Sequence, residues 1–575
     1  MKYNKLLFIV IASLIVSSCN KESICIDADT VIFNTKIYTA NDYKPEAEAV
    51  AIKGKNFIFV GSNKDVESYK CNASSLLDLG GLYVFPGFID AHAHLKSIGY
   101  RELTLNLQGA KSLKDMLAAV EIFSNKKLPG EWVVGRGWIE KKWPEARFPT
   151  LEEIDRFSSD KPVVLERADG HAVIANSFAL NLAGITSTTP SPHGGAINKD
   201  KDGNLTGVLV DKASFLVEQL IPKKTISEDK EALEVALRIS AQLGWTQIQD
   251  AGSPFGDFQL LQQINKEGNL DIRIQMYLGM DGSGHAEVGN SYTSTERNPV
   301  DTFLDEGPYL DDEHMLSSRG IKLYADGAIG SRGAAFLDKY NDYDTDGFLI
   351  FKKETTMPIL LKALRNGIQI QTHAIGDRGN RITLDWYEEA FKEIDSVNRL
   401  IEKPRWRIEH SQNIQPEDQV RFKDMDIIAS MQPSHAIGDL HFAGKRLGIE
   451  RLSNAYVWKS LIDQGVIVAG GSDAPVEIGD PRIEFKAAIS RTDLEGYSGE
   501  GWHLEEVVSR QEALKMFTIW PSFSVFEEDI KGSVEVGKLA DLTIFSKDIM
   551  TIPAEEIMSS ENMMTIVSGK VVYSR

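Results

Sequence analysis

Short apolar runs alternate with helix-length segments through the middle of the chain. Runs of four to eight apolar residues between turn residues are typical of strands, and their alternation with helical segments predicts a parallel α/β architecture. Eight such strands close a (β/α)8 barrel. The sequence therefore predicts an α/β, TIM-like barrel within residues 84–529, with strands at 84–91, 246–249, 272–278, 321–324, 368–372, 406–409, 427–431 and 466–469.

Both ends of the chain show a different pattern, rich in β-branched and aromatic residues. Strands are predicted near the start at 30–33, 36–39, 49–52, 57–60 and 76–79, and near the end within 532–545 and 564–573. We expect one small β-sandwich domain built from residues 29–83 and 530–575. An extra segment at about 100–225 follows the first barrel strand and is expected to form an inserted subdomain over the barrel mouth.

The first residues are a targeting segment rather than part of the fold. Lys2 and Lys5 precede an apolar run at 6–16, which is too short to span a bilayer, and small residues then lead to Cys19. This resembles a bacterial lipoprotein signal, which implies lipidation of Cys19 and a lipid anchor in the cell envelope, on the periplasmic face or the outer membrane. An ordinary secretory signal that contains a cysteine is the alternative.

The net charge and the cysteine content limit which partners and which disulfides the chain can have. The chain has 575 residues and a formal net charge of -20. No long basic run follows the first residues, which argues against a nucleic-acid partner. Besides Cys19, only Cys25 and Cys71 are present. They form either one disulfide or two inert thiols, and the sequence does not decide between these.

Metal-ligating side chains recur at the ends of the predicted strands. His92 and His94 end the first strand, and alternation along a strand points both, with Asp90, to one face. Barrel enzymes place their chemistry at the carboxyl ends of the strands. Four more candidates lie at such ends: Lys322, His373, His410 and Asp473. The sequence therefore predicts a metal centre at these strand ends, with Asp90 as a partner of the ligands rather than as a ligand itself.

At these positions the chain resembles a known family, the metal-dependent amidohydrolase superfamily, and within it the amidohydrolase-3, YtcJ-like branch, which includes enzymes like N-substituted formamide deformylase. The resemblance covers nearly all of the chain after residue 29. The motifs that carry it are PGFIDAHAH (86–94), DGHAVIANS (169–177), IKLYADG (321–327), GSR (330–332), QTHAIGD (371–377), RIEHS (407–411), MQP (431–433), GGSDAP (470–475) and GKLADL (537–542).

The resemblance implies roles for these residues. His92 and His94 would bind one divalent metal, with zinc favoured, and His373 and His410 a second, if two ions are present. Lys322 would bridge them as a carboxylated lysine, and Asp473 would contact the first metal. The implied reaction is hydrolysis of amide-type C–N bonds in N-acyl, N-formyl or imide-like small molecules. A metal-activated hydroxide would attack the carbonyl carbon, with Asp473 as general acid/base.

The residues themselves also bear on Lys322. A strand of a parallel sheet is covered on both faces, so an inward ammonium carries a large desolvation cost, which carboxylation removes. The alternative is a Lys322 paired with a nearby carboxylate such as Asp326.

Three further residues are candidates for substrate binding. His171, in the insertion, would orient a substrate carbonyl, or else is a rim histidine. Arg332 would hold a substrate carboxylate bidentately, or else forms a surface salt bridge. His435, after the seventh strand, is expected to line the pocket.

Two other functions compete with C–N hydrolysis. One is deamination of a cyclic amidine on the same barrel, but residues 373–378 offer no glutamate for the base such an enzyme uses. The other is a non-catalytic, lipid-anchored binding protein. A binder has no need of Asp473, so the intact set of six ligand candidates argues against it. Oligomeric state is open.

Overall fold

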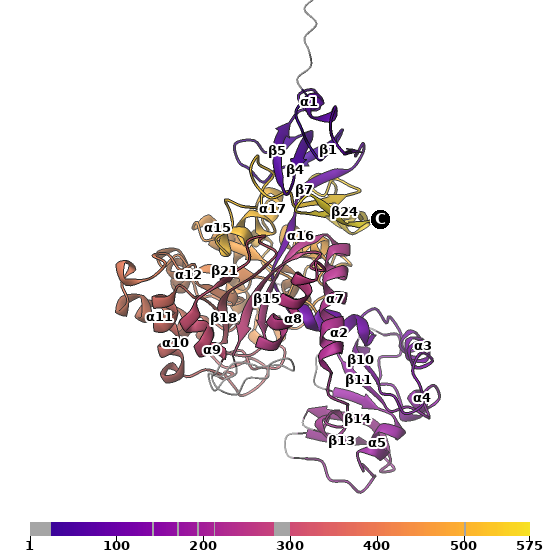
Figure 1. Ribbon diagram of the computed structural model, residues 1–575. Helices are drawn as coiled ribbons and strands as arrows, with labels where there is room; N and C mark the ends of the chain where they lie inside the picture. Colours follow the sequence, from indigo (N-terminus) through magenta and orange to yellow (C-terminus); the bar gives the residue numbers. More distant parts are fainter. Residues whose placement is uncertain are drawn as a thin grey trace, which may run out of the picture.

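The fold is seen in a computed structural model that describes residues 25–140, 143–168, 172–192, 195–211, 213–280, 299–499 and 502–575. The lipoprotein signal with Cys19, and His171, lie outside the described residues. The small domain with β1, β4 and β5 lies at the top of Figure 1, the barrel in the middle, and the segment inserted after α2 at the lower right.

Eight parallel strands form the barrel, which confirms the predicted α/β class and strand number. They are hydrogen-bonded in sequence order, and a short antiparallel strand, β17 (Tyr309–Leu310), pairs with the fourth of them. The barrel strands are β8 (Phe88–Ala93), β15 (Trp245–Ser253), β16 (Arg273–Gly279), β18 (Leu316–Tyr324), β19 (Gln369–Ala374), β20 (Arg407–His410), β21 (Ile428–Met431) and β22 (Val468–Gly470).

Hydrogen bonds from residues just after β22 join the last barrel strand to the first. The Asp473 N–H donates to the His92 carbonyl oxygen at 2.6 Å, and the Ser472 N–H donates to Asp90 Oδ1 at 2.9 Å. The closure therefore brings a predicted ligand of the last strand directly beside those of the first.

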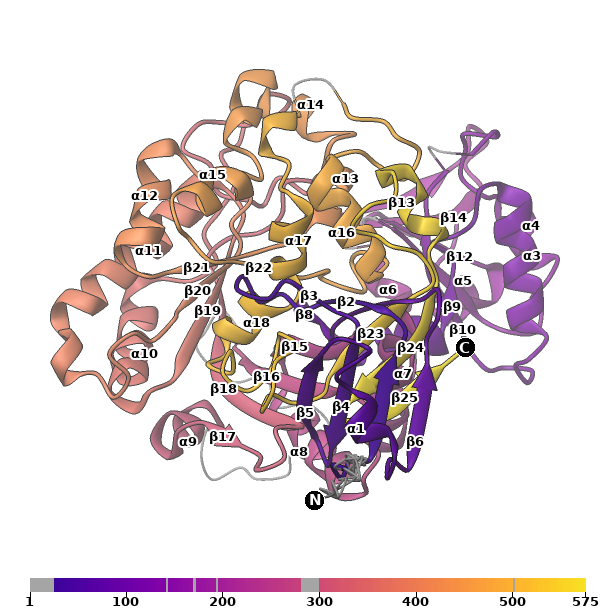
Figure 2. The same ribbon diagram turned by 90° about the horizontal axis from the view of Figure 1, so that it is seen from above.

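Helices follow the strands and cover the outside of the barrel. Figure 2 shows α10, α11, α12 and α15 outside β18 to β21. The helices of this part are α2 (Leu95–Leu103), α7 (Ile226–Leu243), α8 (Phe255–Lys266), α9 (Pro299–Glu306), α10 (Lys353–Asn366), α11 (Asp377–Glu393), α12 (Pro416–Asp424), α13 (Pro433–Asp439), α14 (Ala443–Leu447), α15 (Trp458–Asp463), α16 (Pro481–Ser490), α17 (Arg510–Met516) and α18 (Ile519–Ser524).

The apolar run at 84–91 is not one strand, as predicted, but two. β7 (Tyr83–Pro86) belongs to the terminal sheet, and β8 starts the barrel at Phe88. Gly87 lies between them, where a Cβ would collide with the Thr246 side chain. Only glycine fits this close approach, so the chain can pass from one sheet directly to the other.

Two sheets are assembled from the ends of the chain. One is ordered β5-β4-β1-β6, and the other, ordered β25-β24-β23-β7-β2-β3, holds strands from both ends. Ile32 and Val50 of the first sheet share a buried cluster with Val84 and Leu542 of the second. The strands are β1 (Thr30–Phe33), β2 (Lys36–Tyr38), β3 (Glu46–Ala47), β4 (Ala49–Lys53), β5 (Asn56–Gly61), β6 (Ser75–Asp78), β23 (Leu542–Phe545), β24 (Asn562–Val567) and β25 (Lys570–Ser574).

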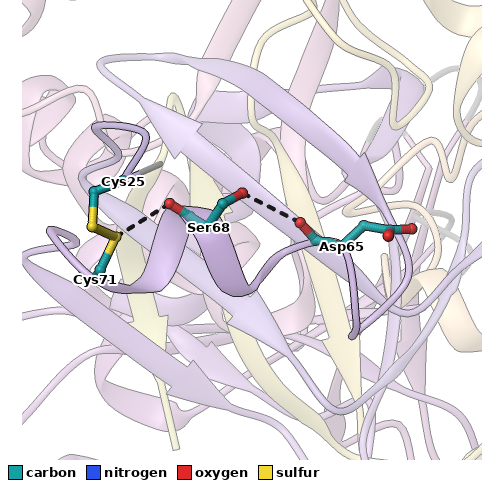
Figure 3. Close-up of a disulfide and its surroundings, with 4 residues drawn as sticks. All are labelled: Cys25, Asp65, Ser68 and Cys71. Carbon is teal, nitrogen blue, oxygen red and sulfur yellow. Dashed lines mark hydrogen bonds between the residues drawn. A yellow bond between two sulfur atoms is a disulfide. The ribbon is translucent and has the colours of Figure 1, made fainter. Parts of the chain in front are cut away.

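A disulfide joins Cys25 to Cys71 at the end of this domain, with 5.9 Å between the Cα atoms (Figure 3). Cys71 directly follows α1 (Glu67–Lys70), and its Sγ lies 3.3 Å from the Ser68 carbonyl oxygen. Of the two alternatives left open by the sequence, the disulfide is therefore the one the structure shows. It ties the first described residues to the small domain.

The segment between α2 and α7 has its own six-stranded sheet, ordered β13-β14-β12-β11-β10-β9. Hydrophobic clusters cover it, and Trp138 and Trp143 are buried in one of them. The elements are β9 (Leu105–Asn106), α3 (Leu113–Ser124), β10 (Val133–Trp138), α4 (Leu151–Asp155), β11 (Val163–Arg167), β12 (Ala172–Ala175), α5 (Ser177–Leu182), β13 (Gly195–Lys199), β14 (Leu205–Asp211) and α6 (Phe215–Glu218).

Within the described ranges, none of the helices combines the length and apolar character needed to cross a membrane.

A buried ion pair beyond α18 predicts a pH-dependent stability. Glu527 Oε2 lies 2.8 Å from Lys531 Nζ, and both side chains are almost fully buried. Burial alone raises the pKa of Glu527, but the charge of Lys531 and the contact with His314 outweigh it and lower this pKa to about 2. Its folded pKa is depressed, so it stabilises the fold above its ordinary pKa of 4.5, and this contribution is lost as the pH falls towards 2.

We expect Glu527→Gln to lower the free energy of unfolding by about 3 kcal/mol at neutral pH, and by clearly less at about pH 3. Denaturant unfolding at both pH values measures this, with the exposed Glu231→Gln as the control. A loss of the same size at both pH values would contradict the assignment.

Candidate metal centre

A cavity of about 1080 Å³ opens at the carboxyl ends of the barrel strands. Five of the six predicted ligands line it, and the sixth, His92, is fully buried among them. The insertion contributes Arg136 and Arg167 to the wall. The five ligands on the wall are His94, Lys322, His373, His410 and Asp473. The cavity thus lies where barrel enzymes bind substrate.

Three donor atoms converge on one point of this cavity. Asp473 Oδ1 lies 3.1 Å from His94 Nε2 and 3.6 Å from His92 Nε2. This oxygen is buried and has no hydrogen-bond partner among the described residues. A buried carboxylate oxygen facing two imidazole nitrogens is an incomplete arrangement without a cation, so the residues fit a divalent metal.

The remaining histidines lie beside this group. The ring centroids of His92 and His410 are 4.8 Å apart, and those of His373 and His410 are 4.5 Å apart. Burial lowers the pKa of His92 to about 4 and that of His373 to about 3, and it lowers the pKa of His410 well below its ordinary value. Neutral imidazoles offer the lone pairs that metals bind.

The outer nitrogens of two of these histidines are held by buried partners. His92 Nδ1 contacts Glu409 Oε2, and His410 Nδ1 lies 2.8 Å from Gln432 Oε1. Donation from Nδ1 leaves the Nε2 lone pair free for a metal. Glu409 and Gln432 are functional residues that the sequence analysis missed.

Two ligand candidates sit in a backbone conformation that non-glycine residues seldom adopt. His410 has a φ of 71° and Asp473 a φ of 56°. Such residues cost of order 1 kcal/mol or more and are retained mainly where function requires them. The strained backbone therefore lies at the two positions that supply His410 and Asp473 to the cavity.

Lys322 is 1% exposed and lies in the same group, with Nζ 3.4 Å from His92 Nε2. Burial lowers the pKa of its ammonium to about 8. No carboxylate of the described residues lies within 4.0 Å of Nζ. The alternative pairing with Asp326 is therefore wrong. The Asp326 carboxylate instead accepts three backbone N–H groups at 2.8–2.9 Å, from Ala335, Ile375 and Gly376.

Comparison with known proteins agrees with this geometry. The sequence profile of the amidohydrolase family matches residues 75–573. The chain belongs to the amidohydrolase family. It is accordingly a hydrolase of carbon–nitrogen bonds other than peptide bonds, and its His/Asp cluster is a site for a divalent metal.

Individual relatives of this amidohydrolase span nearly its whole length. YtcJ of Bacillus subtilis (strain 168) is 30% identical over 550 residues, which cover 94% of this chain and 98% of YtcJ. An N-substituted formamide deformylase of Arthrobacter pascens is 27% identical over 95% of this chain and 98% of its own length. An uncharacterized metal-dependent hydrolase of Pyrococcus horikoshii OT3 has the same fold, with a TM-score of 0.71 and 24% identity over 91% of this chain and 99% of its own.

Asp90, expected as a partner of the ligands rather than as a ligand, binds the backbone of both segments that carry His92 and Asp473. The side chain is 1% exposed, and Oδ2 accepts from the Ser472 hydroxyl at 2.5 Å while Oδ1 accepts from the Ser472 N–H at 2.9 Å. Oδ1 also accepts from the backbone N–H of His92, not from its ring. Asp90 therefore joins the segment that carries Asp473 to the strand that carries His92.

Two of the three substrate-binding candidates lie on the cavity wall of this amidohydrolase. His435 Nε2 is 2.9 Å from Asp473 Oδ2, and its Nδ1 is 3.1 Å from Glu477 Oε1. The Arg332 guanidinium binds Asp342 bidentately, at 3.1 Å from Nε and 2.9 Å from Nη2. The third candidate, His171, is outside the described residues.

Glu409 predicts a test of the histidine geometry. It is fully buried, contacts the His92 ring, and lies 2.8 Å from Arg407 Nε. Glu409→Gln keeps the shape but removes the charge that fixes the His92 tautomer, so we expect metal affinity to fall by roughly 10- to 100-fold.

Metal titration of the chelated protein measures this effect. Glu528→Gln is the matched control, because Glu528 also pairs with an arginine, Arg405, but contacts none of the described histidines. Unchanged metal affinity in Glu409→Gln would contradict the role given to Glu409.

Proposed function

We propose that this amidohydrolase cleaves amide-type C–N bonds in N-acyl, N-formyl or imide-like small molecules. The observation that carries the proposal is the unpartnered Asp473 Oδ1 facing His92 and His94 at the cavity wall. The relative named N-substituted formamide deformylase supports N-formyl compounds as part of the substrate class.

The chain would hold the metal through neutral imidazoles and oxygen ligands. His92, His94 and Asp473 would hold one ion, and His373 and His410 a second where two are bound. Lys322 would bridge them as a carboxylated lysine, which accords with its burial and with the lack of a carboxylate within 4.0 Å among the described residues. Zinc is the favoured ion, since imidazole and carboxylate ligands suit it.

A divalent metal bound here supplies Lewis acidity and an activated water nucleophile. Asp473 then does the proton chemistry. Its Oδ1 has no hydrogen-bond partner among the described residues and can take the proton of the nucleophile, while Oδ2 stays in contact with His435 at 2.9 Å. Returning that proton to the leaving nitrogen lets the amine depart neutral, which C–N cleavage requires.

The cavity suits a small molecule with an apolar part. Its volume of about 1080 Å³ exceeds that of a single amide group, and Ile329, Ile375 and Phe442 contribute apolar wall. Substrate would enter between the barrel mouth and the insertion, whose Arg136 and Arg167 also line the cavity.

The proposal also includes the cellular location of the enzyme. We infer that Cys19 is lipidated and that the chain is held in the bacterial cell envelope by this anchor alone. The two terminal sheets then form a β-sandwich between the anchor and the barrel, with the Cys25–Cys71 disulfide at its start, in accord with an oxidising compartment.

A substrate screen on the metal-loaded protein tests the proposed reaction. The panel contains N-acyl amino acids, N-substituted formamides, imides, cyclic ureas and cyclic amidines. We expect amine release with a new carboxylate or formate from at least one of the first four classes. Ammonia release from the amidines alone would replace this function with deamination.

A further inference from the structure

Two arginines of the cavity wall share a single carboxylate. Arg332 binds Asp342 through Nε and Nη2, and Arg446 Nη1 contacts the same carboxylate. We call these three residues the arginine cluster. Both guanidinium groups belong to the wall of the cavity that holds the metal ligands.

The arginine cluster carries one excess positive charge. Hydrogen bonds from Arg332 and Arg446 lower the pKa of Asp342 to about 2, so it is ionised at neutral pH. Among the described residues, no second carboxylate lies within 4.0 Å of either guanidinium, whose recorded ion pairs both end on Asp342. Two cations against one anion leave the arginine cluster with a positive charge.

Arg332 still has a donor to offer. Its side chain is 29% exposed, and Nη1 donates to no acceptor in the described part of the chain. Its backbone has a φ of 61°, a strained conformation for a residue with a long side chain. Strain at a cavity wall is expected where a side chain is placed for a ligand.

The loop that carries Arg332 also touches the metal centre. The Gly327 carbonyl oxygen lies 3.4 Å from His373 Nε2. The loop closes on itself, since the Gly327 N–H donates to the Gly333 carbonyl oxygen at 3.2 Å. Arg332 therefore directly precedes Gly333, whose carbonyl oxygen is hydrogen-bonded to the residue that contacts His373.

We propose that the arginine cluster binds a carboxylate of the substrate, and that the preferred substrates are N-acylated or N-formylated amino acids rather than neutral amides. The Nη1 group of Arg332, which has no acceptor among the described residues, can donate to a carboxylate while Nε and Nη2 stay on Asp342, and the excess charge of the cluster favours an anion over a neutral group. The inference rests on the proposed function, because it concerns the same cavity and the same C–N bond.

The test compares an N-acyl amino acid with its methyl ester on the metal-loaded enzyme. We expect kcat/KM to be higher for the acid, by on the order of 10- to 100-fold. Arg332→Gln and Arg446→Gln should each raise KM for the acid and leave the ester almost unchanged. Asp342→Asn should act in the opposite direction and lower KM for the acid, since it removes the competing carboxylate.

Arg238→Gln, an exposed change on α7, is the matched control and should affect neither substrate. Equal cleavage of acid and ester, with Arg332→Gln altering both alike, would overturn the carboxylate subsite and leave the proposed function standing. If neither acid, ester nor any neutral amide is hydrolysed, the proposed function itself fails.

Discussion

Replacing Asp473 by asparagine is expected to lower turnover by about 10³-fold while the protein keeps its metal. Asparagine retains an oxygen at the position that faces His92 and His94, so the donor set is only weakened. It cannot take or return a proton at neutral pH, so the leaving nitrogen stays unprotonated and C–N cleavage is slowed. The loss should appear in kcat more than in KM, because proton transfer occurs in the transition state.

Steady-state kinetics and metal analysis on the same preparation decide this prediction. Asp463→Asn, which changes an exposed carboxylate paired with Lys459, serves as the control and should leave both quantities unchanged. Turnover near the wild-type level in Asp473→Asn would show that another group is the acid/base. Loss of metal together with turnover would mean that Asp473 acts chiefly as a ligand.

Replacing Lys322 by alanine is the second change with a large expected effect. The side chain is 1% exposed at the junction of the two histidine groups, where a carboxylated lysine would supply oxygen ligands to both. We expect Lys322→Ala to lose most activity and at least part of its metal. A short carboxylic acid such as acetate should restore some of both, because it places a carboxylate in the space that the alanine leaves.

Carbon-13 NMR after growth with labelled bicarbonate gives a direct readout of the modification. A carbamate signal is expected in the wild type and not in Lys322→Ala or Lys322→Arg. Full activity and metal content in Lys322→Arg would contradict a bridging carboxylated lysine, since arginine keeps the positive charge but offers no oxygen ligand.

The ligand candidates could be predicted from the sequence because each lies near the end of a strand that the apolar pattern predicts. His373 and His410 follow predicted strands at 368–372 and 406–409; β19 ends at Ala374, one residue beyond His373, and β20 ends at His410. The order of parallel strands then brings such residues together at one end of the barrel. The same reasoning placed His435 on the cavity wall, where it is found.

Other features depend on contacts between distant segments. Glu409 is one residue from a predicted ligand, but its partner His92 lies 317 residues away in the sequence. Asp90 shares a strand with His92, yet it binds Ser472 across the barrel seam. The break at Gly87 falls inside an unbroken apolar run and is set by the side chain of Thr246. Periodicity within a segment carries no information on such pairings.

Metal analysis of the purified protein, followed by chelation and reconstitution, tests the metal-dependent C–N hydrolase most directly. We expect one or two equivalents of zinc, manganese or iron per chain, loss of amide hydrolysis on chelation, and recovery when the metal is restored. A protein that contains none of these metals, and that gains no hydrolytic activity when they are added, would contradict the account.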